Sequence, residues 1–159
     1  MASKLVGASV WEEDLYDHLV SHIEKERDLL VTYQQAASYS GSAAFRYLAS
    51  LIVEDEIRHH RMFEDLAESL RADTELRSEI PRIPRLDHWG EDRERVVGLT
   101  EELITEEEND ANELRRLAKE LRDVKDTTMW QLVVKLMEMD TAKHLEILNF
   151  VRKHAEHAR

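Results

Sequence analysis

Apolar residues recur every three or four positions over four long stretches of the chain, which is the spacing of amphipathic helices. This pattern predicts helices over residues 10–40, 42–70, 92–124 and 127–157. Few residues interrupt the pattern, because the chain of 159 residues contains only four Gly and two Pro. The strand signal is weak throughout. We therefore predict an all-α fold.

Local signals mark the ends of the first two predicted helices. Ser9 is a candidate N-cap, and acidic residues follow it in the first turn, where they favour the positive end of the helix dipole. Ser40-Gly41-Ser42 ends the first helix and caps the second. So short a connection predicts a tight antiparallel hairpin.

Residues 71–91 form the longest predicted connection, and Pro81 and Pro84 prevent a helix from continuing through it. A helix of about 28 residues is about 42 Å long. Twenty partly extended residues can return along that length. We predict one four-helix bundle domain over residues 1–159, with this connection crossing from one end of the bundle to the other.

The composition excludes several classes of protein. The chain has no Cys, which rules out disulfides, zinc–thiolate sites and thiol catalysis. Its net charge of −12 argues against nucleic acid or an anionic membrane as partner and is compatible with attracting cations. No apolar run approaches the ~20 residues that span a bilayer, and the first residues do not resemble a signal peptide. We expect a cytoplasmic protein.

Each predicted helix carries one acidic residue at the centre of its apolar face. These residues are Glu26, Glu56, Glu107 and Asp140. A single acid on an apolar face commonly lies at its edge, where it snorkels or forms a salt bridge. Four acids at matched depth are a rarer coincidence, since buried anions repel one another unless they are protonated or neutralised by cations. Hard or borderline metal ions with carboxylate and imidazole ligands would neutralise them.

The second helix adds a histidine to its acid. Glu56 and His59 are three residues apart, so both side chains can reach one point from the same face of the helix. Four-helix bundles that bind two metals use one Glu from each of two helices and a Glu-x-x-His pair from each of the other two. In such a scheme Glu26 and Glu107 are the single glutamates.

At this point the chain resembles the ferritin-like superfamily, and most closely its rubrerythrin-like branch. The resemblance covers roughly residues 12–155. It is carried by Glu26 with Tyr33 in the first helix, Asp55-Glu56-x-x-His59 in the second, Glu107-x-x-Asp110 in the third and Asp140 in the fourth.

The resemblance implies a non-haem di-metal carboxylate protein, with two iron ions expected, that reacts with O2 or peroxide as a ferroxidase or peroxidase. One metal ion alone, or Mn or Zn in place of iron, is an alternative. No catalytic residue is expected beyond the metal ligands. Because the chain has no Cys, a rubredoxin-type centre is absent and any electron donor is external. The resemblance also implies a homodimer or a higher homo-oligomer. The implied ligands are Glu26, Glu56, His59, Glu107, Asp140 and His144.

The fourth helix departs from this pattern, because Asp140-Thr-Ala-Lys143-His144 stands where Glu-x-x-His is expected. Two alternatives are open. Either His144 replaces the missing histidine, or Lys143 places its ammonium group among the acids and replaces one cation, which leaves one metal or none. In the second case the protein is a degenerate ferritin-like bundle that acts as a structural or interaction module. Storage of iron in an assembled cage is a third possibility.

Three further residues lie close to these motifs. His22 is one turn before Glu26 and is either a packed histidine or a ligand. His60 could orient a ligating carboxylate or replace His59 as ligand. Asp110 lies one turn after Glu107 and is a further candidate carboxylate ligand.

Overall fold

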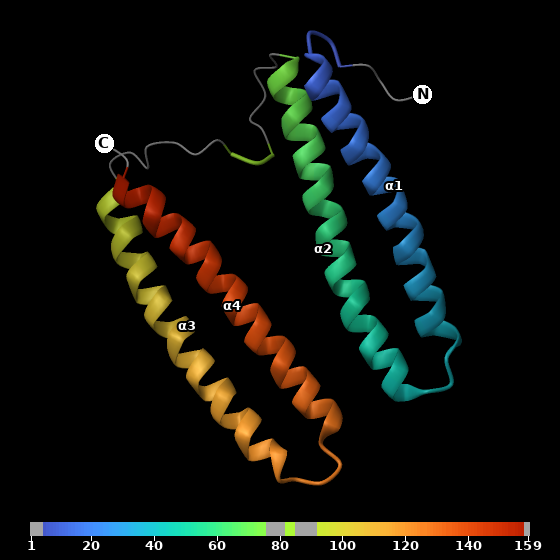
Figure 1. The fold of residues 1–159 in the computed structure, drawn as a ribbon, viewed down its shortest axis with the longest axis vertical. Coiled ribbons are helices and arrows are strands. Elements are labelled where there is room, and N and C mark those ends of the chain that lie inside the picture. The colour runs from blue at the N-terminus through green and yellow to red at the C-terminus, as the bar shows by residue number, and fades with distance from the viewer. Residues whose placement is uncertain (1–4, 76–81, 85–91, 158–159) are drawn as a thin grey trace. The chain divides into compact units, whose positions relative to one another are not determined.

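Four helices make up most of the computed structural model, which describes residues 5–75, 82–84 and 92–157 (Figure 1). This confirms the predicted all-α class. The chain divides into two units, Met1–Arg85 and Leu86–Arg159. The first unit is a hairpin of α1 and α2, and the second is a hairpin of α3 and α4. The helices are α1 (Val10–Tyr39), α2 (Ala43–Thr74), α3 (Arg93–Arg122) and α4 (Thr128–His157).

Side-chain caps begin α1 and α2 at the predicted positions. The Glu12 N–H donates to Ser9 Oγ at 3.3 Å, and the Glu12 carboxylate accepts from the Ser9 N–H at 2.7 Å. This reciprocal pair is a capping box, which satisfies two backbone donors at the helix end. At the start of α2, Ser42 Oγ accepts from the Phe45 N–H at 3.3 Å. The two predicted caps are confirmed.

Helix α2 is longer than predicted, because it continues to Thr74 instead of ending at residue 70. The Thr74 hydroxyl donates to the carbonyl oxygens of Leu70 and Arg71 at 3.0 and 3.1 Å. Arg71 also pairs with Glu68 at 2.8 Å, an i,i+3 contact that supports this turn of the helix. Residues 71–74, which precede the two prolines, therefore extend α2 by about one turn.

The turn between α3 and α4 begins two residues earlier than predicted, since α3 ends at Arg122. Thr127 is buried, and its hydroxyl donates to the carbonyl oxygens of Leu121 and Val124 at 3.0 Å each. Asp126 has a φ of 63°, a left-handed conformation that Asp tolerates better than most residues. These contacts close the second hairpin.

A short described piece of the long connection lies beside α2. The Ile83 N–H donates to Ser69 Oγ at 2.9 Å, and Nη1 of Arg82 lies 3.5 Å from Oδ1 of Asp65. The chain has therefore turned back along α2 by residue 83. The rest of the predicted crossover, residues 76–81 and 85–91, lies outside the described residues.

Small and apolar residues line the contact within each hairpin. In the first hairpin the buried residues include Leu19, Ala49 and Ala67. In α4 the buried line runs through Val134 and Thr141. That line lies one residue away from the predicted stripe, which contains Asp140. A rotation of about 100° per residue separates the two lines, so α4 turns Thr141, and not Asp140, most deeply into its own hairpin.

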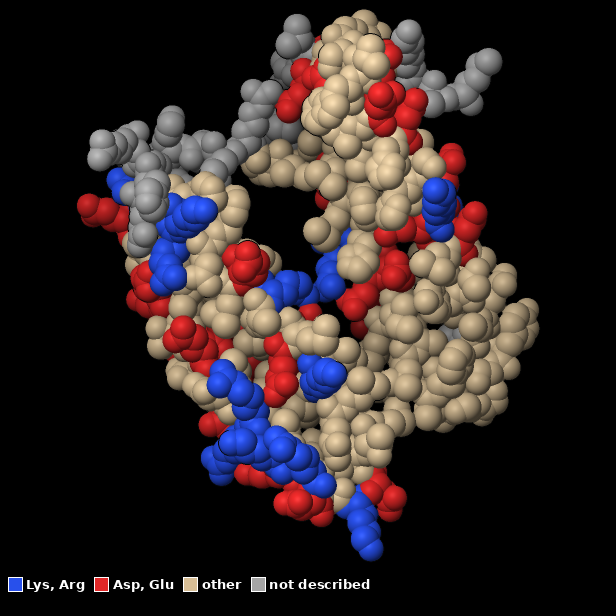
Figure 2. Space-filling view, in the orientation of Figure 1, with Lys and Arg blue, Asp and Glu red and all other residues tan. Residues whose placement is uncertain are grey.

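In the unit formed by α3 and α4, Lys and Arg side chains gather toward the C-terminal end of α3, among Asp and Glu side chains (Figure 2). The last turn of this helix contains Lys119 and Arg122, where positive charge interacts favourably with the helix dipole. None of the helices in the described ranges combines the length and the apolar character needed to cross a membrane.

Candidate metal centre

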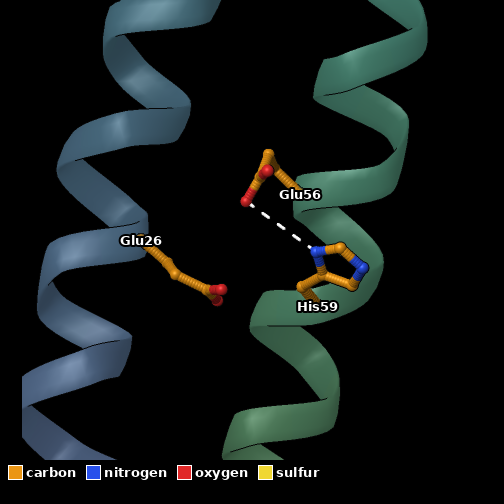
Figure 3. Close-up of side chains that lie close together, drawn as sticks. All are labelled: Glu26, Glu56 and His59. Atoms are coloured by element: carbon orange, nitrogen blue, oxygen red, sulfur yellow. Dashed lines mark ion pairs between the residues drawn. The ribbon is translucent and has the colours of Figure 1, made fainter.

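Helices α1 and α2 bring three candidate ligands together inside the first hairpin. Glu26 points from α1 toward α2, and Glu56 and His59 come from neighbouring turns of α2 (Figure 3). One ligand atom from each residue lies within 4.8 Å of the other two. Within the described part of the chain, this is the one group of three or more acidic, His or Cys residues that meets that distance.

Glu26 is the most deeply buried member of this group, with 8% of its surface exposed. Its Oε1 lies 3.4 Å from Nε2 of His22, one turn earlier on α1. Its Oε2 is buried and has no hydrogen-bond partner among the described residues. A buried carboxylate oxygen without a partner is costly, and a cation would remove that cost.

The ring of His22 packs against α2, and 40% of its side chain is exposed. It contacts the ring of Phe63 in α2, with the two centroids 4.2 Å apart. The same ring contributes the nitrogen that faces Glu26. Of the two alternatives for His22, this geometry matches a packed histidine that orients the Glu26 carboxylate.

Glu56 and His59 face the same space from α2. Nδ1 of His59 lies 4.0 Å from Oε2 of Glu56, which is longer than a hydrogen bond. The Glu56 side chain is 19% exposed and that of His59 is 46% exposed. Two carboxylates and an imidazole are a suitable donor set for divalent iron, manganese or zinc. The residues present therefore fit a metal ion.

The neighbours of this motif form pairs of their own. His60 lies 3.3 Å from Glu64 through its Nε2, and Asp55 pairs with Arg58 at 2.8 Å. His60 does not belong to the three-residue group. Nε2 of His60 thus faces Glu64, while its Nδ1 is buried without a hydrogen-bond partner among the described residues.

The second hairpin has a separate acidic pocket of about 470 Å³. His144 in α4 reaches Glu107 in α3, with its Nδ1 3.2 Å from Oε1. The Thr141 hydroxyl donates to Oδ2 of Asp110 at 3.0 Å, also across the two helices. The pocket is lined by Glu106, Glu107, Asp110, Leu114, Met137, Asp140, Thr141 and His144.

Lys143 forms an ion pair with Asp140 one turn earlier on α4. Both side chains are partly exposed, 39% for Lys143 and 56% for Asp140. Three of the pocket carboxylates therefore have a partner inside the second hairpin. His144 contacts Glu107, the Thr141 hydroxyl donates a hydrogen bond to Asp110, and Lys143 forms an ion pair with Asp140.

The predicted ligands fall into two groups of three. Glu26, Glu56 and His59 are brought together by the first hairpin. Glu107, Asp140 and His144 line the pocket of the second hairpin. The assignment of all six to one two-metal site stays a prediction.

Thr141 is one of the pocket residues that the sequence pattern did not indicate. It follows the acid that lies on the apolar stripe, so its type and position resemble those of an ordinary small core residue. A stripe centred one position later in α4 would have placed it against Asp110. No sequence signal separates these two choices.

Comparisons of the chain with protein-family models, curated proteins and solved structures give no match. The functional argument therefore rests on the chemistry of the residues and on the geometry within each hairpin.

Proposed function

We propose that this protein binds divalent metal through Glu26, Glu56 and His59 and belongs to the non-haem di-metal carboxylate proteins of the ferritin-like, rubrerythrin-like kind. Iron is the metal we propose, with reaction toward O2 or peroxide as the activity. The observation that carries the proposal is the buried Oε2 of Glu26, which has no partner among the described residues and belongs to the Glu26–Glu56–His59 group.

The roles of the three side chains follow from their burial. Glu26 supplies a carboxylate fixed by the core and by its contact with His22. Glu56 and His59 supply a second carboxylate and an imidazole from consecutive turns of one helix. A bound metal would contribute redox chemistry and an open position for an oxidant. The protein's contribution is to hold the three donors at fixed separations and to limit the access of water to Glu26.

The test is anaerobic binding of Fe(II) to the metal-free protein, followed by exposure to air. We expect the wild type to bind at least about one iron per chain, as one three-donor group supports, and to accelerate iron oxidation over buffer. Glu56→Gln should lose most of both. Glu54→Gln is the matched control, because Glu54 is exposed and lies two residues away on the same helix. Iron content by elemental analysis and absorbance of the ferric product give the two readouts.

Two results would overturn the proposal. The first is a wild type that binds less than one iron per chain and oxidises iron no faster than buffer. The second is an equal effect of Glu56→Gln and Glu54→Gln, which would show that general acidity, and not this group, attracts the metal.

A second candidate function is a helical structural or interaction module without redox turnover. The pair between Lys143 and Asp140 favours it, because an ammonium group occupies the place where the resemblance implies a histidine ligand. A module that binds no metal should have the same melting temperature in chelator and in metal, since a ligand stabilises only the native state to which it binds. A metal-dependent rise in melting temperature would exclude that metal-free form, and acceleration of iron oxidation over buffer would exclude the candidate altogether.

A further inference from the structure

We infer that the ammonium group of Lys143 takes the place of a bound cation in the second hairpin and weakens metal binding there. The protein's two metal sites then differ in affinity. The inference rests on the proposed function, since it concerns the affinity of the second metal. Its basis is the difference between the two hairpins in how their carboxylates are partnered.

In the first hairpin, one carboxylate oxygen has no hydrogen-bond partner among the described residues. Oε2 of Glu26 is buried without a partner among the described residues, and the nearest atoms of Glu56 and His59 are too far apart to satisfy each other. A divalent ion that binds here displaces no internal partner of this oxygen. Its binding free energy is therefore not reduced by the loss of an existing contact at that atom.

In the second hairpin, three of the four pocket carboxylates already have a partner. Asp140 pairs with Lys143, and Glu107 faces His144. A metal ion that takes Asp140 as ligand must break the pair with Lys143. It must also approach the ammonium group of Lys143, which lies against the Asp140 carboxylate, and like charges repel at so short a separation. Both effects lower affinity at this position.

The spacing within α4 indicates that Lys143 is the residue that lowers the metal affinity at Asp140. It stands three residues after Asp140, so the two side chains meet on one face of the helix. His144, four residues after Asp140, is turned to Glu107 across the hairpin. The Lys143 ammonium group thus lies at the Asp140 carboxylate, while His144 contacts Glu107 on the neighbouring helix α3.

The experiment is titration of metal-free protein with Mn(II), with free Mn(II) counted by electron paramagnetic resonance. The wild type should bind one Mn(II) tightly and a second one more weakly. Lys143→Gln should lower the dissociation constant of the second Mn(II) by about tenfold, from the lost ion pair and the lost repulsion. The first dissociation constant should not change.

Three further variants assign the effect. Lys135→Gln removes the same charge from an exposed position of α4 and should leave both constants unchanged. Lys143→Arg keeps the positive charge and should keep the weak second site. Adding Asp140→Asn to Lys143→Gln should return the second site to weak binding, because the Asp140 carboxylate is then lost as a ligand.

The outcomes separate this inference from the proposed function. Equal isotherms for the wild type and Lys143→Gln, with one tight Mn(II) still bound, would overturn the role of Lys143 alone. An equal gain in Lys135→Gln would do the same, since it would show a general charge effect. A wild type that binds no Mn(II) would overturn both.

Discussion

Glu26 and His22 form a pair on α1 that satisfies only half of the carboxylate. Nε2 of His22 lies 3.4 Å from Oε1 of Glu26, while Oε2 stays buried without a partner among the described residues. The candidate site therefore contains a group that costs stability by itself and that a bound metal ion would supply with a partner. This relationship leads to a prediction about stability as well as about binding.

Replacing Glu26 with Leu should stabilise the metal-free protein. A Leu at this position extends the apolar face on which Leu19 is buried and removes the unsatisfied oxygen. We expect a gain of about 1 kcal/mol, which corresponds to a rise in melting temperature of about 2–4 °C for a chain of this size. Thermal unfolding followed by circular dichroism in the presence of chelator measures it.

Under the proposed function, metal should raise the melting temperature of the wild type, and the same variant should lose this rise. Glu24→Leu is the control, because Glu24 is exposed on the same helix and should change neither quantity in this way. A metal-free Glu26→Leu protein that melts below the wild type would contradict the prediction. It would show that the carboxylate makes a net favourable contribution to the hairpin.

Two adjacent histidines should differ sharply in their effect on metal binding. His59 belongs to the three-residue group, whereas His60 lies 3.3 Å from Glu64. His59→Ala should weaken Mn(II) binding at the first site by at least about tenfold, because it removes a donor. His60→Ala should leave that affinity within about twofold and lower the melting temperature instead, since it breaks a partly buried pair.

The contrast between these two variants is the measurement. Titration with Mn(II) gives the affinity, and thermal unfolding in chelator gives the stability. If His60→Ala weakens binding as much as His59→Ala does, the ligand assignment within the pair of histidines is wrong.

The helices and the first group of candidate ligands could be predicted from sequence because both depend on local periodicity. Helical spacing placed Glu56 and His59 on one face, and a hairpin with a three-residue turn left Glu26 beside them. Such inferences need only the 3.6-residue repeat and a short connection. The structure confirms the helices and brings these three residues together.

The second hairpin could not be predicted to the same depth, because its contacts depend on side-chain choices between competing partners. His144 could have faced Asp140 or Glu107, and Lys143 could have pointed to solvent. The structure pairs His144 with Glu107 and Lys143 with Asp140. A rotation of α4 by one residue decides which side chains meet α3, and the apolar residues of α4 permit either setting.

The capping box at the start of α1 should give a pH-dependent contribution to stability. Hydrogen bonds from the side chain and the backbone of Ser9 lower the pKa of Glu12 from its ordinary value of 4.5. A lowered pKa in the folded state means that the contribution is fully present above pH 4.5 and is lost as the pH falls through the folded-state pKa.

Glu12→Ala should therefore lower the melting temperature at neutral pH, and its difference from the wild type should shrink in acid. Thermal unfolding of both proteins between neutral pH and pH 3 or so follows this difference. Ser9→Ala supplies a second arm, because it removes the hydroxyl partner. In that background Glu12→Ala should cost less than it does alone, since residues in one hydrogen-bonded pair do not act additively. A difference that persists unchanged into acid would contradict the assignment of the effect to the carboxylate.

The hydrogen bond from Thr141 to Asp110 should stabilise the second hairpin by joining α4 to α3. Thr141 is 4% exposed, and its hydroxyl donates to the Asp110 carboxylate at 3.0 Å. Thr141→Val keeps the shape of the side chain and removes the donor. The exposed Asp110 carboxylate can form a hydrogen bond with water instead, so the loss of stability should be about 1 kcal/mol, or about 2–4 °C in melting temperature.

Thr105→Val is the control, since the Thr105 hydroxyl donates to the carbonyl oxygen of Glu101 in its own helix. Thermal unfolding in chelator should show a clear loss for Thr141→Val and little for Thr105→Val. Equal melting temperatures for these two variants would show that the inter-helix bond contributes nothing measurable.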